Sequence, residues 1–257
     1  MPIMAFDGTT GELIASFGDG MFLRPHGLRV DGQDNIWVTD KDYNQIHKFS
    51  HDGRLLMTIG AKGVPGQDGN HFNGIADLAF TSAGDFYVAD GYQNNRIAKF
   101  SKDGKFLFEW GSKGDQPGQF NVPHSVAVDA KGRVYVADRS NFRVQVFDSQ
   151  GRFLRQWKGP EIGCPWGVTV GPDGFLYMVD GGDAFLTQNR LDPNPTRNDR
   201  AGILKMDLDG NIVEKFGSYG HYDGQFIWPH DVAVGKDGAV YVGDVHTGMR
   251  VQKFVKR

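Results

Sequence analysis

Three histidines in the chain each follow a proline and open a short apolar run. They lie in Pro25-His26-Gly27-Leu28, Pro123-His124-Ser125-Val126 and Pro229-His230-Asp231-Val232. Successive copies are about two units of a repeat apart, so the histidines fall on alternate repeats. In a ring of six repeats, alternate positions lie about 120° apart, and the three imidazoles converge on one point. Three nitrogen ligands with an open fourth position form a catalytic zinc site, and other divalent transition metals are alternatives.

The elements that must position these histidines belong to a repeated strand–turn–strand unit. Copies begin at His26, Ile75, His124, Trp166 and His230. Each copy contains short runs rich in Val, Ile, Phe and Tyr, separated by turn pairs such as Asp-Gly. No segment has a sustained helical period. The repeat therefore predicts an all-β protein of the β-propeller type, with four antiparallel strands in each blade.

The two ends of the chain leave the number of blades open. Residues 3–18 look like the last two strands of a further repeat, and the last copy stops after its third strand, at residues 250–254. One solution is a six-bladed template with five full repeats and a partial one. The alternative is a closed five-bladed ring. We expect a single domain over residues 1–257, present as a monomer or as a homo-oligomer whose second copy completes the ring.

A polar insertion, residues 183–200, interrupts the fourth repeat and is expected to form a surface loop.

Composition narrows the classes of partner. The formal net charge is −3 and no basic block occurs, so nucleic-acid binding has little support. The longest apolar runs have the length of strands, which predicts no transmembrane helix, and residues 1–20 do not resemble a signal peptide. Cys164 is the single cysteine, which excludes an intrachain disulfide and fits either a reducing compartment or many bacterial secreted proteins. The compartment is left open, and a small-molecule or peptide-derived substrate is the expected partner.

A set of short motifs carries a resemblance to a known family. They are PHGL (25–28), WVTD (37–40), NHF (70–72), ADGYQNNRI (89–97), PGQFNVPHS (117–125), VADRSNFR (136–143), WPHDVAV (228–234) and VGDVHT (242–247). Together they resemble NHL-repeat propellers and, more closely, the lyase domain of peptide-amidating enzymes, peptidyl-α-hydroxyglycine α-amidating lyase. The likeness runs from about Ile3 to the C-terminus.

The resemblance implies two metal sites. The zinc of that family is implied at His26, His124 and His230, in agreement with the spacing of the Pro-His steps. A structural calcium is implied at the Leu28 carbonyl and at Asp231. The calcium ligand that the first blade of the family supplies has no counterpart in this chain.

The resemblance also implies an active site. The active-site tyrosine of the family falls on Tyr92, and a substrate-binding arginine falls on Arg139. Trp228 stands where the family has a methionine and is expected to narrow the pocket. A second catalytic arginine, from the first blade of the family, and the disulfide cysteines are missing here.

Further polar residues were weighed from their positions alone. His71 lies in the loop before an apolar run, and His246 closely follows Asp244, so both are second-tier candidates for the site. An aspartate recurs at the same position in all five repeats, which favours a structural role. These are Asp40, Asp90, Asp138, Asp180 and Asp244.

Three functions are compatible with these residues. The leading hypothesis is a metal-dependent lyase that cleaves an N-acyl-α-hydroxyglycine to an amide and glyoxylate, with Tyr92 as base and Arg139 orienting the substrate. A metal-dependent hydrolase of esters, lactones or phosphotriesters on the same three histidines is the second. A non-catalytic NHL scaffold is the third, because a fold alone does not decide function.

Overall fold

The computed structural model describes residues 2–182 and 200–256. Within these ranges the protein consists of strands, turns and one short 3-10 helix, η1 (Arg139–Asn141). The predicted insertion at 183–200 lies outside the described residues except for Arg200. The chain divides into two compact units, Met1–Trp110 and Gly111–Arg257, and the expected single domain over 1–257 stays a prediction.

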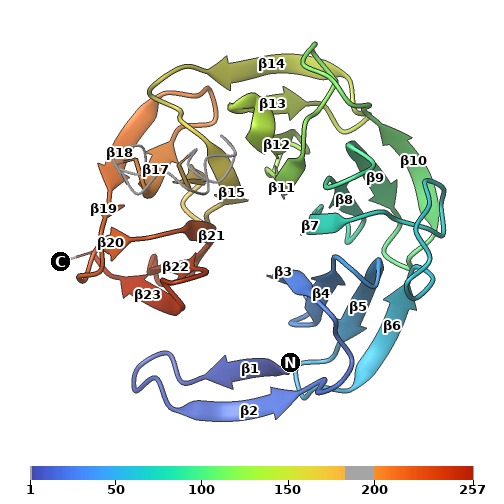
Figure 1. Cartoon of the computed structure of the whole chain (residues 1–257), viewed down its shortest axis with the longest axis horizontal. Coiled ribbons are helices and arrows are strands. Elements are labelled where there is room, and N and C mark those ends of the chain that lie inside the picture. Colours follow the sequence, from blue (N-terminus) through green and yellow to red (C-terminus); the bar gives the residue numbers. More distant parts are fainter. Residues whose placement is uncertain (1, 183–199, 257) are drawn as a thin grey trace. The chain divides into compact units, whose positions relative to one another are not determined.

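The first unit contains two four-stranded antiparallel sheets, the first and second blades. The first blade is β3 (Pro25–Val30), β4 (Ile36–Asp40), β5 (Gln45–Phe49) and β6 (Leu55–Ile59); the second is β7 (Ile75–Phe80), β8 (Phe86–Asp90), β9 (Arg96–Phe100) and β10 (Phe106–Trp110). In both sheets the strands pair in chain order. Their first strands, β3 and β7, pack against each other (Figure 1).

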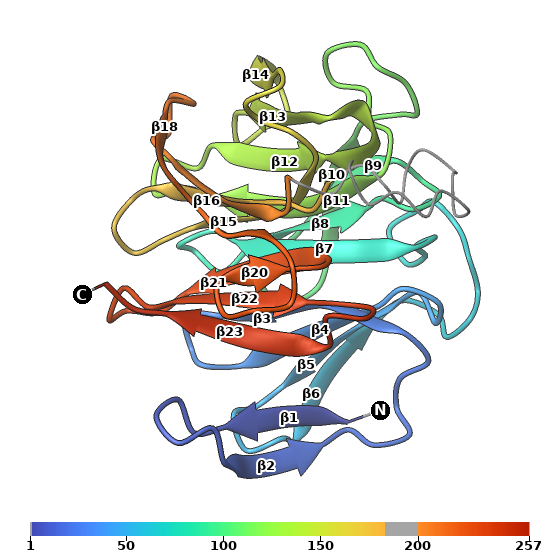
Figure 2. The same cartoon turned by 60° about the vertical axis from the view of Figure 1, so that its left-hand side comes forward.

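The second unit contains the third, fourth and fifth blades. These are β11 (Pro123–Val128), β12 (Val134–Asp138), β13 (Arg143–Phe147) and β14 (Phe153–Lys158); β15 (Pro165–Val170), β16 (Leu176–Asp180), β17 (Gly202–Met206) and β18 (Ile212–Phe216); and β21 (Pro229–Val234), β22 (Val240–Asp244) and β23 (Arg250–Phe254). Strand β15 contacts both β11 and β21. Strands β21, β22 and β23 form one three-stranded sheet, and Figure 2 shows them side by side. A short parallel pair, β19 (Ser218–Tyr219) and β20 (Gln225–Phe226), precedes the fifth blade.

The hairpin of β1 (Ile3–Phe6) and β2 (Leu13–Phe17) packs on the first blade as the outer half of a further blade would. Phe17 of β2 lies against Gly53, in the turn between the third and fourth strands. Ile59 lies against the equivalent Gly104 of the second blade, and Trp157 against Gly210 of the fourth. The hairpin therefore occupies the place of third and fourth strands, as expected for residues 3–18.

The predicted all-β fold of four-stranded repeats is confirmed. Five blades are present among the described residues, which matches the five-bladed alternative in number, while the six-bladed template stays a prediction. Successive side chains of a strand point to opposite faces of the sheet, so apolar residues on the two faces pack against different neighbours. Trp37 packs toward the second blade with Phe86, whereas Val38 packs toward the hairpin with Ile3.

A glutamine on the third strand holds the loop before the blade in two of the five repeats. The Gln145 side chain accepts from the Gly118 N–H at 3.0 Å and donates to the Gln119 carbonyl at 2.7 Å. Gln252 makes the same pair of hydrogen bonds in the fifth blade. The first blade has His47 at this position, 4% exposed, with Nδ1 3.1 Å from Thr58 Oγ1 and no hydrogen-bond partner for Nε2.

His47 is expected to make folding sensitive to mild acid. Burial lowers the pKa of His47 below its ordinary value of 6.5, so below about pH 6.5 the unfolded chain takes up a proton that the folded chain resists. Stability is lost as the pH falls from 7.5 to 5. We predict that His47→Gln reduces this loss, because a glutamine does not titrate and fits the Gln145 pattern. Urea unfolding at both pH values measures it.

The exposed His51 provides the control for that experiment. His51→Gln should leave the difference in stability between the two pH values as it is in the wild type. An unchanged difference in His47→Gln would show that folding does not lower the pKa of His47.

Candidate metal centre and active site

Buried carboxylates at the end of the second strand fix the segment that leads into each Pro-His step. In the third blade Asp138 accepts a hydrogen bond from the Asn121 N–H at 2.7 Å. In the first and fifth blades the donors lie even closer to the proline, because Asp40 accepts from Arg24 and Asp244 from Trp228. Charged acceptors make strong bonds to backbone N–H groups. The structural role predicted for the repeated aspartates agrees with these contacts.

In the first unit, His26 is held in one tautomer. Its Nδ1 lies 2.8 Å from the Ala76 carbonyl oxygen in β7. A carbonyl only accepts, so Nδ1 carries the hydrogen and Nε2 keeps its lone pair. The Tyr92 hydroxyl lies 2.9 Å from that Nε2 and donates to it. This pair, His26 and Tyr92, forms one half-site.

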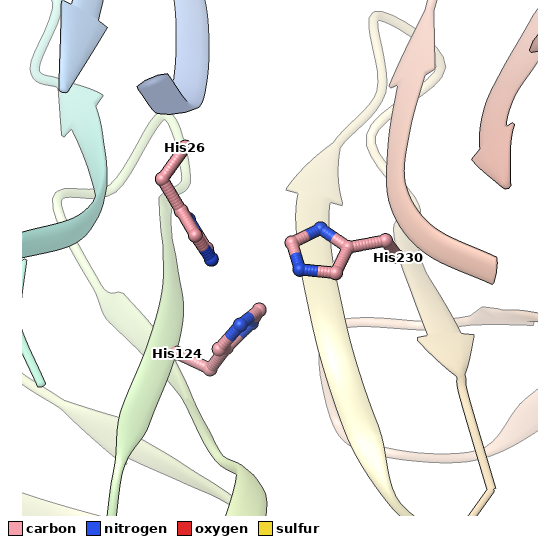
Figure 3. Close-up of side chains that lie close together, drawn as sticks. All are labelled: His26, His124 and His230. Carbon is pink, nitrogen blue, oxygen red and sulfur yellow. The ribbon is translucent and has the colours of Figure 1, made fainter. Parts of the chain in front are cut away.

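In the second unit, His124 is held in the same way. Its Nδ1 donates to the Trp166 carbonyl oxygen in β15 at 2.7 Å, which leaves a lone pair on Nε2, and the side chain is buried. His230, half-buried at the start of β21, presents its imidazole to that of His124, with ring centroids 4.7 Å apart. Figure 3 shows these two rings close together, in the edge-to-face arrangement, and also labels His26 of the first unit. An imidazole whose second nitrogen donates to a carbonyl is the usual form of a metal ligand.

Arg139 and His124 both contact Trp166, and together they form the second half-site. It is the first residue of η1 and is buried, and its guanidinium lies 4.7 Å from the centre of the Trp166 ring. The buried Cys164 thiol contacts the Arg139 carbonyl at 3.6 Å. A guanidinium stacked on an aromatic face keeps its N–H groups in the ring plane for other acceptors.

The second-tier candidates, His71, His246 and Trp228, make contacts that do not by themselves indicate a metal or substrate site. The His71 Nδ1 contacts Asp68 within its own loop at 2.9 Å, which ties that imidazole to the loop. Trp228 packs beside Trp166, with ring centroids 6.2 Å apart, and His246 is exposed and meets the Trp228 ring edge-on at 5.8 Å. Trp228 is therefore the second-tier residue that shares a neighbour with the His124 half-site.

The residues around Leu28 do not fit a calcium ion. The Leu28 carbonyl accepts a hydrogen bond from Arg29 at 3.2 Å, and the same guanidinium pairs with Asp77 at 2.6 Å. The Asp77 side chain is 4% exposed, so its charge requires a partner. A permanent cation already neutralises the oxygen donors here and would repel a dication. Asp231, the other implied ligand, accepts from the Val232 N–H at 2.9 Å.

Sequence reasoning missed the partners that orient the site. The carbonyl acceptors belong to Ala76 and Trp166, which occupy the histidine position in the second and fourth repeats. A backbone carbonyl carries no side-chain signal, although the alternation of histidine with other residues pointed to that position. Arg29 was also missed. The other repeats have small residues at the equivalent position, such as Ala79, so a long basic residue there was a signal that could have been used.

Comparison with known proteins places the chain in a family. The NHL repeat model matches residues 22–49, 72–100, 120–147 and 226–254. NHL repeat-containing protein 3 of Mus musculus is 33% identical over 92% of this chain and 70% of its own length. The chain belongs to the NHL-repeat family.

Homology to amidating enzymes covers almost the whole chain. Peptidyl-α-hydroxyglycine α-amidating lyase 1 of Drosophila melanogaster is 35% identical over 99% of this chain and 49% of its own length. Peptidyl-glycine α-amidating monooxygenase B of Xenopus laevis is 36% identical over 98% of this chain. The chain spans about half of the first relative and 28% of the second. These relatives confirm the predicted resemblance.

A solved structure supports the fold. Virginiamycin B lyase from Staphylococcus aureus, with selenomethionine, superposes with a TM-score of 0.57 at 17% identity, over 90% of this chain and 69% of that one. No helix in the part of the chain described is long and apolar enough to cross a membrane.

Arg29 is expected to make stability independent of calcium. Thermal unfolding should give the same Tm in millimolar Ca²⁺ and in chelator. Arg29→Met should lower the Tm by about 10 °C, because it removes the guanidinium that pairs with the buried Asp77 carboxylate. Arg29→Met/Asp77→Asn should recover much of the loss.

Arg152 provides the matched control, because its pair with Asp148 is exposed. Arg152→Met should change the Tm by about 1–2 °C at most. A higher Tm of the wild type in Ca²⁺ would show that a calcium ion binds in spite of Arg29.

Proposed function

We propose that the two half-sites bind one divalent transition-metal ion together, through Nε2 of His26 and of His124 and through His230. Zinc is the metal proposed, because neutral imidazole nitrogens suit it and three of them leave a position for substrate. The support is the same in both units: a backbone carbonyl holds Nδ1–H and leaves Nε2 as the ligand atom. Histidines that merely lined a water-filled channel would not need to share this tautomer.

We further propose that the protein is a lyase for N-acyl-α-hydroxyglycines. In this reaction the substrate hydroxyl loses its proton, its oxygen forms the carbonyl of glyoxylate, and the C–N bond breaks as the nitrogen gains a proton to become an amide. The observation that carries the proposal is the Tyr92 hydroxyl at 2.9 Å from the His26 ligand atom, in a chain homologous to amidating lyases. A bound metal would polarise the hydroxyl and lower its pKa.

The residues of this chain have separate tasks in that reaction. Tyr92 stands beside a metal ligand and is proposed to take the proton from the substrate hydroxyl. Arg139, fixed on the Trp166 face, is proposed to bind an anionic or carbonyl oxygen of the substrate. Trp228 packs beside Trp166 and is proposed to limit the size of the acyl group.

A second candidate function is a non-catalytic NHL scaffold. It is favoured by the 33% identity to NHL repeat-containing protein 3, a relative whose name specifies repeats and no reaction. A hydrolase acting on esters, lactones or phosphotriesters is the other enzymatic alternative with the same histidines. Metal content separates the scaffold from both enzymes, and the nature of the product separates the lyase from the hydrolase.

The metal proposal is tested by elemental analysis of protein purified without chelator. We expect about one transition-metal ion per chain in the wild type and loss of that ion in His124→Ala, because two ligands bind far more weakly than three. His51→Ala, which changes an exposed histidine, should keep the ion. A metal-free wild type that does not take up zinc on dialysis would remove the metal centre and favour the scaffold.

The reaction is tested with α-hydroxyhippurate, with glyoxylate and benzamide measured as products. The metal-loaded wild type should form both in equal amounts, and Tyr92→Phe should lower kcat by about 10²–10⁴-fold with unchanged metal content, because the proton acceptor is lost. Tyr222→Phe changes a tyrosine that is 80% exposed and should retain full activity. Turnover of esters without any glyoxylate formation would favour the hydrolase.

A further inference from the structure

We infer that Lys41 is a second substrate-binding cation, and that it selects carbinolamides that carry a free carboxylate. The inference rests on the proposed lyase function and specifies the substrate class of that site. It assigns a role to a residue that the sequence did not single out.

The position of Lys41 in its blade is the position of Arg139 in the third blade. Each follows the aspartate that ends the second strand, Asp40 in β4 and Asp138 in β12. The second and fourth blades have glycine at this position, and the fifth has Val245. A basic residue therefore occurs here in two of the three blades that carry a Pro-His step.

The two cations also make contacts of the same kind, although Tyr92 follows β8 and Trp166 lies in β15. The Lys41 ammonium lies 4.6 Å from the centre of the Tyr92 ring, and the Arg139 guanidinium lies 4.7 Å from that of Trp166. In each case the aromatic residue belongs to the following blade. The histidine of the same blade donates its Nδ1–H to a carbonyl of that following blade, from Ala76 or Trp166. Cation, aromatic face and oriented imidazole thus recur as one arrangement in each unit.

The charge of Lys41 is only partly engaged by protein groups. Its ammonium contacts Asp42 Oδ1 at 3.1 Å, and the other oxygen of Asp42 contacts Arg24, also at 3.1 Å. One carboxylate is thus shared by two cations, while an ammonium has three donors. The Lys41 side chain remains 19% exposed, so a ligand can reach it.

The place of Lys41 determines which part of the substrate it would meet. It stacks on the ring whose hydroxyl contacts His26 Nε2. In an α-hydroxyglycine the carboxylate and the hydroxyl are bonded to the same carbon. A carboxylate bound by Lys41 therefore keeps that hydroxyl beside Tyr92, and Arg139 is left for another oxygen of the substrate. A neutral carbinolamide lacks the group that Lys41 recognises.

The test compares wild type, Lys41→Met and Lys41→Arg on two substrates. With α-hydroxyhippurate, Lys41→Met should raise KM by about 10–100-fold, because a charge-assisted hydrogen bond is lost, and Lys41→Arg should recover much of it. With N-(hydroxymethyl)benzamide, which has no carboxylate, the three proteins should have the same KM. Calorimetric titration with hippurate, which has the carboxylate but no hydroxyl to react, measures the same contact without turnover.

Lys62→Met is the matched control, because Lys62 lies 4.2 Å from the Tyr43 ring in the same unit and is exposed. It removes a similar cation–aromatic contact and should change neither KM nor hippurate affinity. Equal KM and equal hippurate affinity in wild type and Lys41→Met would overturn the inference while leaving the lyase intact. Hippurate binding that depends on Lys41, without any glyoxylate formation, would support carboxylate recognition by Lys41 and reject the lyase. Failure of the wild type to bind hippurate or turn over either substrate would overturn both.

Discussion

The rest of each blade depends on the hydrogen bonds that backbone N–H groups donate to a buried carboxylate. Asp138 shows the arrangement most completely, because it accepts from Asn121 N–H and from the side chains of Asn141 and Arg143. It joins the end of the second strand to the loop before the first and to the start of the third. A buried carboxylate is costly unless such donors surround it. Once it is satisfied, the backbone on both sides of it has little freedom left.

This constraint separates the residues that make a blade from those that can vary. Two positions lie next to the fixed carboxylate without contributing to it: the second residue of the first strand and the residue after the aspartate. The first is histidine in three blades and Ala76 or Trp166 in the other two, and the second is Lys41, Arg139, Val245 or glycine. Because the backbone at both positions is already held, their side chains can change without loss of the fold. A rigid backbone with variable side chains is what a precise site needs.

The repeat and the candidate ligands could be predicted from sequence because each repeats a local pattern. Turn pairs and alternating apolar residues mark the strands, and the recurrence of Pro-His marks positions related by the repeat. The orientation of each imidazole could not be predicted, since it depends on the carbonyls of Ala76 and Trp166 in the next blade. Lys41 was overlooked because a single lysine after a strand has no distinctive local pattern. The calcium at Leu28 is implied by the family resemblance alone, and the hydrogen bond from Arg29 to the Leu28 carbonyl argues against it.

Arg29 illustrates how a close approach of two strands creates a requirement for charge. A side chain at Gly27 would come within 2.7 Å of the Ala76 carbonyl oxygen and 3.1 Å of the Asp77 carboxylate, so only glycine lets β3 and β7 approach this closely. That approach buries the Asp77 carboxylate between the two strands. A cation must then accompany it, and it can be a bound ion or a side chain. In this chain the guanidinium two residues after Gly27 reaches the carboxylate at 2.6 Å. The countercharge is thereby covalently attached, so its presence does not depend on the concentration of any ion.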